Sequence, residues 1–247
     1  EREIKKQEKK KREMQEFYEK FKAKATKARQ AISRKKQLEK MDEIEIKRSS
    51  RKPPVFQFPT AKKSSQRILT ANNLCKSFDK NLVLDNLNIK LMRGDKIAIL
   101  GPNGIGKTTL LKILLNEIEQ DSGRIDWGKN IAYGYYAQDH SDQLPPNNTP
   151  YKWLEDKYPL ESIGNIKGVL GKMLFAEEDM ERVTKSLSGG EAARLVFARL
   201  MLQETNLLIL DEPTNHLDLE SIEALARELK KYPGTIIFVS HDRFFVE

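Results

Sequence analysis

A glycine-rich turn limits the possible folds of this chain more than any other segment. The turn follows an apolar run at residues 96–100, short enough for a buried strand, and leads into residues 110–115, which are apolar around most of a helix. In the pattern G-x-x-x-x-G-K-[ST], backbone N–H groups surround a phosphate, while the lysine and the hydroxyl bind phosphate oxygens and Mg²⁺. We therefore predict a phosphate-binding loop made of Gly101, Pro102, Asn103, Gly104, Ile105, Gly106, Lys107, Thr108 and Thr109.

The length of 247 residues allows one large domain with an appendage and a sizeable buried core. No apolar run approaches the roughly 20 residues that a bilayer crossing needs, so we expect no membrane partner. The single cysteine, Cys75, excludes an intramolecular disulfide, and no signal-peptide pattern is present, so we expect a cytoplasmic protein. Because the sequence opens with Glu1 inside a helical pattern, we expect a fragment of a longer chain.

Positive charge is concentrated at the N-terminal end of the sequence. Residues 1–66 hold 22 Lys+Arg against 10 Asp+Glu, whereas residues 67–247 hold 22 against 26. A basic segment beside a slightly acidic remainder is typical of an electrostatic contact with nucleic acid phosphates.

The N-terminal segment also has the composition of a long helix. Residues 1–52 contain no glycine or proline and are rich in good helix formers. Apolar residues repeat at alternating intervals of four and three, which predicts a narrow seam for a partner helix: Met14, Tyr18, Phe21, Ala25, Ala28 and Ile32. We predict a charged linker helix at residues 1–48, either a binding surface or a solvated spacer. Pro53 and Pro54 end the pattern, so residues 49–66 are predicted to be an extended connector.

The remaining sequence predicts an α/β fold with an inserted helical subdomain. Residues between 139 and about 204 have a helical pattern after a proline-rich loop, and the flanking segments have strand patterns. The predicted strands are residues 68–70, 82–84, 87–91, 96–100, 123–127, 131–136, 207–210 and 235–239.

Two further motifs carry chemistry. Asp211 and Glu212 end an apolar strand, and adjacent strand residues point in different directions, so the two carboxylates can take different roles. We assign Asp211 to Mg²⁺ and Glu212 to the water that attacks a phosphate, as general base or as an orienting group. Ser188, Gly189 and Gly190 precede a helical pattern, where a helix N-terminus favours phosphate, although such a run can also be only a cap.

In this order, the motifs resemble those of an ABC ATPase domain, over about residues 67–247. The resemblance rests on the glycine loop, Gln138 after an apolar strand, Leu187-Ser188-Gly189-Gly190-Glu191, Asp211-Glu212, Leu217-Asp218 and Ser240-His241-Asp242. It implies the P-loop NTPase fold, ATP and Mg²⁺ as cofactors, and ATP hydrolysis together with a second ABC domain in the same full-length chain. It also implies that Phe78 stacks on adenine, that Gln138 contacts Mg²⁺ and the attacking water, that His241 touches the γ-phosphate, and that Ser188, Gly189, Gly190 and Glu191 form the signature motif.

One run narrows the resemblance. Pro213-Thr214-Asn215-His216-Leu217-Asp218 resembles the ABC-F subfamily, whose members carry two ATPase domains joined by a charged helical linker and have no membrane segments. The resemblance implies binding to ribosomes, with the linker reaching ribosomal RNA and tRNA, and a role in translation or ribosome protection. It also implies that the first ATPase domain is absent and the closing C-terminal part is truncated. The alternatives are the ATPase subunit of a transporter and a DNA-associated ABC ATPase.

Overall fold

The computed structural model describes residues 52–79, 81–139 and 143–246, so the predicted linker helix at 1–48 lies outside the described residues. The described chain contains both strands and helices, with a run of helices between β5 and β6. Its elements are β1 (Arg67–Phe78), β2 (Asn81–Met92), β3 (Lys96–Ile99), α3 (Lys107–Leu114), β4 (Ser122–Trp127), β5 (Tyr133–Tyr136), α4 (Pro150–Lys157), α5 (Ile163–Lys172), α6 (Glu177–Met180), the 3₁₀ helix η1 (Thr184–Ser186), α7 (Gly189–Leu202), β6 (Leu207–Asp211), α8 (Leu219–Lys231), β7 (Thr235–Val239) and α9 (Arg243–Val246).

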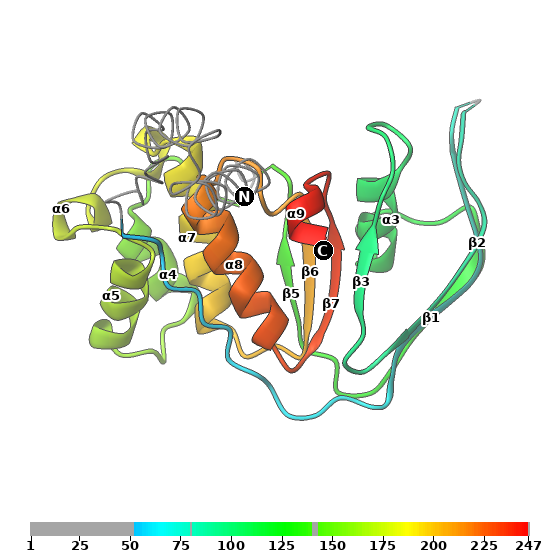
Figure 1. The fold of residues 1–247 in the computed structure, drawn as a ribbon, viewed down its shortest axis with the longest axis horizontal. Coiled ribbons are helices and arrows are strands. Elements are labelled where there is room, and N and C mark those ends of the chain that lie inside the picture. Colours follow the sequence, from blue (N-terminus) through cyan, green and yellow to red (C-terminus); the bar gives the residue numbers. More distant parts are fainter. Residues whose placement is uncertain (1–51, 80, 140–142, 247) are drawn as a thin grey trace, which may run out of the picture. The chain divides into compact units, whose positions relative to one another are not determined.

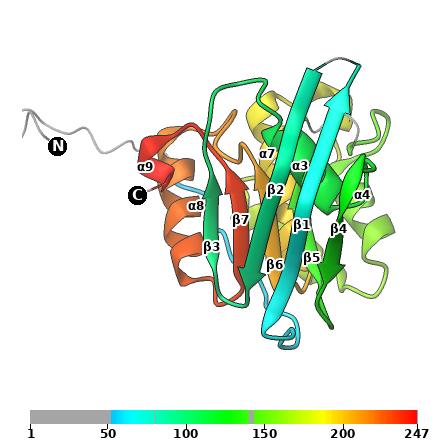
Figure 2. The same cartoon turned by 90° about the vertical axis from the view of Figure 1, so that its right-hand side faces the viewer.

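The strands form two sheets of different kinds. A parallel sheet has the order β3-β7-β6-β5, and an antiparallel sheet has the order β2-β1-β4. Figure 2 shows β2, β1 and β4 side by side, in front of the parallel strands. All five residues of β6 are buried, and the first four are apolar, as expected for a parallel strand that is covered on both faces.

Helix α3 lies between the two sheets (Figure 1). Its apolar residues Leu110, Leu111, Ile113 and Leu114 join one hydrophobic core with residues of both sheets. Helices α7 and α8 cover the other face of the parallel sheet, as Figure 1 also shows, and belong to a second core with α4 and α5. The glycine-rich turn between β3 and α3 is therefore held by packed elements on both sides.

The connector after Pro53 packs tightly against this second core. Phe56 and Phe58 are buried, and the Phe56 ring contacts Phe197 of α7 with its centroid 5.1 Å away. Backbone hydrogen bonds join the connector to the helical part and to the loop before β6, from Val55 N–H to the Lys172 carbonyl (2.9 Å) and from Ala61 N–H to the Thr205 carbonyl (3.0 Å). The described part of this segment, residues 52–66, forms no helix, and Phe56 and Phe58 make it part of the core rather than a free linker.

Most predicted strands are present, with some different limits. The two runs expected at 82–84 and 87–91 form the single strand β2, in which Asn86 has a positive φ of 49° and the register with β1 shifts. The strand expected at 131–136 begins only at Tyr133. In the described residues, no helix has both the length and the apolar character to cross a membrane.

Replacing Gly168 by alanine is expected to stabilise the protein. Gly168 lies inside α5, and a Cβ atom at this position would meet nothing within 4 Å. Because glycine in a helix interior is less favourable than alanine by about 0.5–1 kcal/mol, Gly168→Ala should raise the free energy of unfolding by about that amount. Urea unfolding of both proteins measures the difference.

Gly134→Ala provides the matched control. In β5, a Cβ atom at Gly134 would lie 2.9 Å from Leu200 Cδ2 and 3.1 Å from Thr205 Cγ2, so the same substitution should destabilise. If the Gly168→Ala protein is no more stable than wild type, the inference that a Cβ atom at position 168 meets open space is wrong.

Candidate nucleotide-binding site

The parallel sheet brings four sequence motifs to one edge. Ile99 of β3 pairs with Val239 of β7, Val239 pairs with Asp211 of β6, and Leu210 of β6 pairs with Tyr136 of β5. Since parallel strands end on the same side, the segments that follow all four strands meet there. These segments contain the glycine loop, Ser240 and His241, Glu212, and Gln138.

The loop after β3 has a backbone that requires glycine. Gly104 and Gly106 have φ angles of 83° and 97°, in the left-handed region. Gly106 precedes α3 without a side-chain cap, and a Cβ atom there would overlap Val83 Cγ1 of β2 at 2.2 Å. The loop is therefore pressed against the β1–β2 hairpin, and the first N–H groups of α3 have no partner within the helix.

Lys107 is held at the centre of this loop. Its Nζ donates to the carbonyl oxygens of Gly101 (2.9 Å) and Pro102 (2.8 Å), and the residue is only 8% exposed. A fixed ammonium beside free helix N–H groups forms a site for an anion such as a phosphate.

Asp211 is a fully buried carboxylate that lacks a hydrogen-bond partner. Burial raises the pKa of this carboxyl above its ordinary value, and the nearby Thr108 hydroxyl lowers that pKa in part. Even so, neither Asp211 oxygen meets hydrogen-bond geometry with any described residue. Because burying an unpaired carboxylate is costly, this arrangement favours a bound cation. The oxygen ligands of Asp211, Thr108 and Gln138 are of the type that Mg²⁺ prefers.

Among the described residues, no group of three or more His, Cys, Asp or Glu side chains could hold a metal ion by itself. A cation at Asp211 would therefore depend on phosphate oxygens for part of its coordination, as Mg²⁺ does in nucleotide sites.

Glu212 and His241 form a contact at the same edge. His241 Nε2 lies 2.9 Å from Glu212 Oε1, and the Glu212 backbone N–H donates to the Val239 carbonyl at 2.9 Å. Glu212 has a positive φ of 49°, which a non-glycine residue adopts only where its surroundings hold it. The Glu212 side chain is 7% exposed, so it is fixed at the border of an open space.

Two cavities open at this edge. The larger, of about 1050 Å³, is lined by Thr108, Gln138 and Gly189 among others. The smaller, of about 330 Å³, is lined by Asn103, Gln138, Glu212 and His241 among others. Gln138 lines both cavities, so it borders the space beside Thr108 as well as the space beside the Glu212–His241 pair.

Ser188 caps the helix that carries the predicted signature motif. Its Oγ accepts from the Glu191 N–H at 3.3 Å, and its own N–H donates to Glu191 Oε2 at 2.7 Å, which completes a capping box. Arg182 Nη2 binds the other Glu191 oxygen at 2.7 Å. The cap shapes the start of α7 and does not by itself assign a nucleotide role to Ser188.

Comparison with known proteins places this site in a family. A family model described as "ABC transporter" matches residues 84–215, just over half of the chain, and another model with the same description matches residues 1–58. The chain belongs to the ABC transporter ATPase family. The prediction of an ABC-type P-loop NTPase fold is thereby confirmed.

Relatives of this ABC ATPase domain are considerably longer. The chain is 45% identical over 235 residues to the probable ATP-binding protein YbiT of Escherichia coli, covering 95% of this chain and 44% of that protein. It is 43% identical to the putative ATP-binding protein YdiF of Bacillus subtilis (94% and 36% covered). It is 37% identical to the ABC transporter F family member 2 of Arabidopsis thaliana (88% and 32% covered). The chain thus spans less than half the length of these relatives.

Solved structures show the same fold. The structure of cbiO1 from Clostridium perfringens, part of an ABC transporter complex, matches with a TM-score of 0.56 and 27% identity, covering 72% of this chain and 80% of that one. A bacterial ABC transporter cassette solved as a dimer matches with a TM-score of 0.61 and 20% identity, covering 72% and 90%.

Two residues of the ABC ATPase site were not predicted from the sequence. Tyr135 of β5 packs on the same face as Ile209, its partner in β6, and lines the larger cavity. Its hydroxyl is buried and has no hydrogen-bond partner in the part of the chain that the structure describes. Burial, followed by the Asp211 charge, raises the pKa of Tyr135. The sequence did contain a signal for Tyr135, because this residue lies on a predicted strand, three residues before the predicted site residue Gln138.

His216 is the second unpredicted residue. A Cβ atom on Gly189 would lie 3.2 Å from Nδ1 of the His216 ring. A Cβ atom on Gly190 would lie 2.9 Å from the His216 carbonyl oxygen. His216 has a positive φ of 65°. The close approach of the loop that follows Glu212 therefore favours glycine at position 190, where a Cβ atom would meet backbone, and leaves little space beside Gly189.

Phe78 is a predicted site residue that lies outside both cavities. It ends β1, is 44% exposed rather than part of the core, and does not line either cavity described above. The Lys76 ammonium lies 5.3 Å from its ring centroid. The hairpin that carries Phe78 reaches the glycine loop through Val83, so stacking of Phe78 on adenine stays a prediction.

Proposed function

We propose that this domain binds Mg²⁺-ATP and hydrolyses it together with a second ABC domain, as part of a cytoplasmic ABC-F protein that acts on ribosomes. The observation that carries the ATPase proposal is the meeting of Lys107, Asp211 and Glu212 at one sheet edge, with Gln138 between two cavities. The ABC-F part is supported by the relative named as an F family member and by the run from Pro213 to Asp218.

The chain's own groups suit triphosphate binding. Lys107 and the N–H groups at the start of α3 bind the β- and γ-phosphate oxygens. Thr108, Asp211 and Gln138 hold the cation. When bound, Mg²⁺ neutralises charge that develops on the transferred phosphoryl group.

Glu212 is placed to act on the attacking water. Its carboxylate accepts a proton from that water or orients it, and His241 keeps the carboxylate in position at 2.9 Å. The bond between the γ-phosphorus and the β–γ bridging oxygen breaks as the water oxygen adds, which yields ADP and phosphate.

A second ABC domain completes the proposed site. The start of α7, with Ser188, Gly189 and Gly190, would bind the γ-phosphate of ATP held by the other domain, because a helix N-terminus favours an anion. The cassette solved as a dimer supports this pairing.

Co-sedimentation of the full-length protein with ribosomes tests the ABC-F proposal. We expect ribosome binding that weakens with salt, and weaker binding to duplex DNA or lipid vesicles. Replacing Lys24, Lys27 and Arg34 by Gln should lower ribosome affinity about tenfold and flatten its salt dependence; these residues lie outside the described part of the chain.

The triple variant Lys5, Lys6 and Lys9→Gln provides the control, since it removes the same charge from the first half of the predicted helix. If both variants bind ribosomes like wild type, the helix is a spacer. Tight binding to a membrane transporter subunit, without ribosome binding, would instead favour the transporter alternative suggested by the likeness to cbiO1.

A further inference from the structure

Five exposed basic residues gather at the sheet edge opposite the nucleotide site. Residues 61–67 lie beside the turns that precede β3 and β5, as three hydrogen bonds show. Arg93 Nη1 donates to the Ser64 carbonyl at 2.8 Å, Ser65 N–H donates to the Lys129 carbonyl at 3.0 Å, and Lys129 N–H donates to Ser65 Oγ at 2.9 Å. We call this cluster the basic edge: Lys62, Lys63, Arg67, Arg93 and Lys129.

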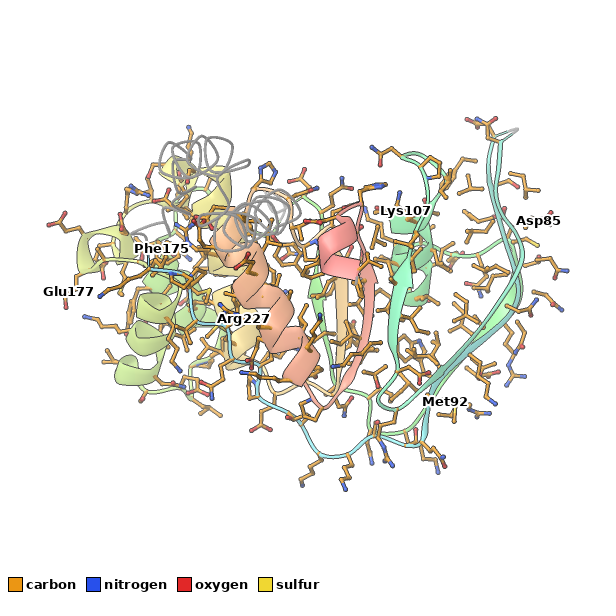
Figure 3. The ribbon with its side chains drawn as sticks, viewed as in Figure 1. Asp85, Met92, Lys107, Phe175, Glu177 and Arg227 are labelled. Atoms are coloured by element: carbon orange, nitrogen blue, oxygen red, sulfur yellow. The ribbon has the colours of Figure 1, made fainter. Side chains whose placement is uncertain are left out.

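Its position follows from the parallel sheet. Arg93 and Lys129 lie just before β3 and β5, and so at the amino ends of these strands, whereas the glycine loop and Gln138 follow their carboxyl ends. Figure 3 labels Met92, the β2 residue that pairs with Arg67 of β1, and Lys107 at opposite ends of the fold. The basic edge therefore stays open when nucleotide binds at the other edge.

The charges of the basic edge are not neutralised by neighbours. All five residues are exposed, and none forms an ion pair within the described ranges of the chain. Two carboxylates close in sequence to Arg93 and Lys129 have other partners: Asp95 Oδ2 accepts from the Met92 N–H at 2.8 Å, and Asp126 pairs with Arg124 at 2.6 Å. A domain whose sequence is slightly acidic thus presents a concentrated positive surface.

Two exposed aromatic rings adjoin this surface. Trp127, two residues before Lys129, stacks on Tyr133 with ring centroids 6.3 Å apart and an interplanar angle of 27°. Trp127 is 36% exposed and Tyr133 44%. Exposed aromatic rings among cations are the combination that binds phosphates and stacks unpaired bases.

We propose that the basic edge, with Trp127 and Tyr133, is an RNA-binding surface on the body of the ATPase domain, separate from the linker helix. It contacts the phosphate backbone through the five cations and stacks an unpaired base on Trp127. As a ribosomal contact this inference rests on the proposed function, but the RNA affinity itself does not. An acidic membrane surface would also bind the five cations, but it has no bases that could stack on Trp127.

Fluorescence anisotropy of a labelled RNA hairpin with an unpaired loop, titrated with the 247-residue chain, tests the inference. Lys63, Arg67 and Lys129→Gln should weaken binding about tenfold or more at physiological salt and make the log–log salt slope shallower by about two. Trp127→Ala should weaken binding about tenfold, whereas Trp127→Phe, which keeps a ring, should restore most of the affinity. Arg93 is left in place because it holds the Ser64 carbonyl.

The matched control is Lys152, Lys157 and Lys167→Gln, which removes the same charge from exposed positions on α4 and α5. Equal losses in both triple variants, or an unchanged salt slope in the basic-edge variant, would overturn the inference. So would binding to phosphatidylserine vesicles without binding to RNA. Thermal unfolding checks that each variant is folded, and ribosome co-sedimentation of the full-length protein separates a failure here from a failure of the proposed function.

Discussion

Glu212→Gln is expected to slow ATP hydrolysis by the full-length protein about 100-fold or more, with ATP binding retained. Glutamine keeps the shape of the side chain and can still accept from His241, but it cannot take a proton from water. Phosphate release measures turnover, and retention of a fluorescent ATP analogue measures binding. With turnover blocked, the ATP-bound protein should also accumulate on ribosomes.

Glu223→Gln is the control for this variant. Glu223 is exposed on α8, the helix that follows the loop after Glu212, so its replacement should leave both turnover and binding unchanged. Unchanged turnover in Glu212→Gln would remove Glu212 from its proposed role, and loss of ATP binding would mean that the carboxylate holds the nucleotide instead.

Phe197→Ala is expected to lower the free energy of unfolding by about 3–5 kcal/mol. Phe197 of α7 is fully buried, with its ring centroid 4.3 Å from that of Tyr136 in β5 and 5.1 Å from that of Phe56 in the connector. Its removal leaves a cavity where the helix, the parallel sheet and the connector meet. Guanidinium unfolding measures the loss.

Two substitutions define the scale of that effect. Phe197→Leu keeps most of the volume and should cost about 1 kcal/mol. Phe78→Ala removes the same side chain from an exposed position and should change the stability by less than about 0.5 kcal/mol. A small loss in Phe197→Ala would mean that the three elements repack around the missing ring.

The sequence was most informative where local pattern and chemistry coincide. Gly104 and Gly106 adopt backbone angles that favour glycine, and a buried strand ends in Asp211, so these features are readable from residue types and spacing. The sequence did not indicate that β2 is continuous through Asn86, because a positive φ and a register shift there accommodate two apolar runs in one strand. Tyr135 and His216 were missed for a different reason, since their importance lies in neighbours distant along the chain.

The sequence by itself determined the phosphate-binding loop, because strand, glycine loop and helix must follow one another directly in the chain, and the order of its motifs carried the resemblance to an ABC ATPase domain. Only the tertiary structure decided that Phe56 and Phe58 belong to the core and that Arg93, Lys129 and residues 62–67 form one basic edge. The charge count along the chain did not indicate this edge, since residues 67–247, which include Arg67, Arg93 and Lys129, hold 22 Lys+Arg against 26 Asp+Glu. The physical reason is the strand order β2-β1-β4 of the antiparallel sheet, which places the end of β2, the start of β1 and the end of β4 side by side. That order depends on long-range packing rather than on local pattern.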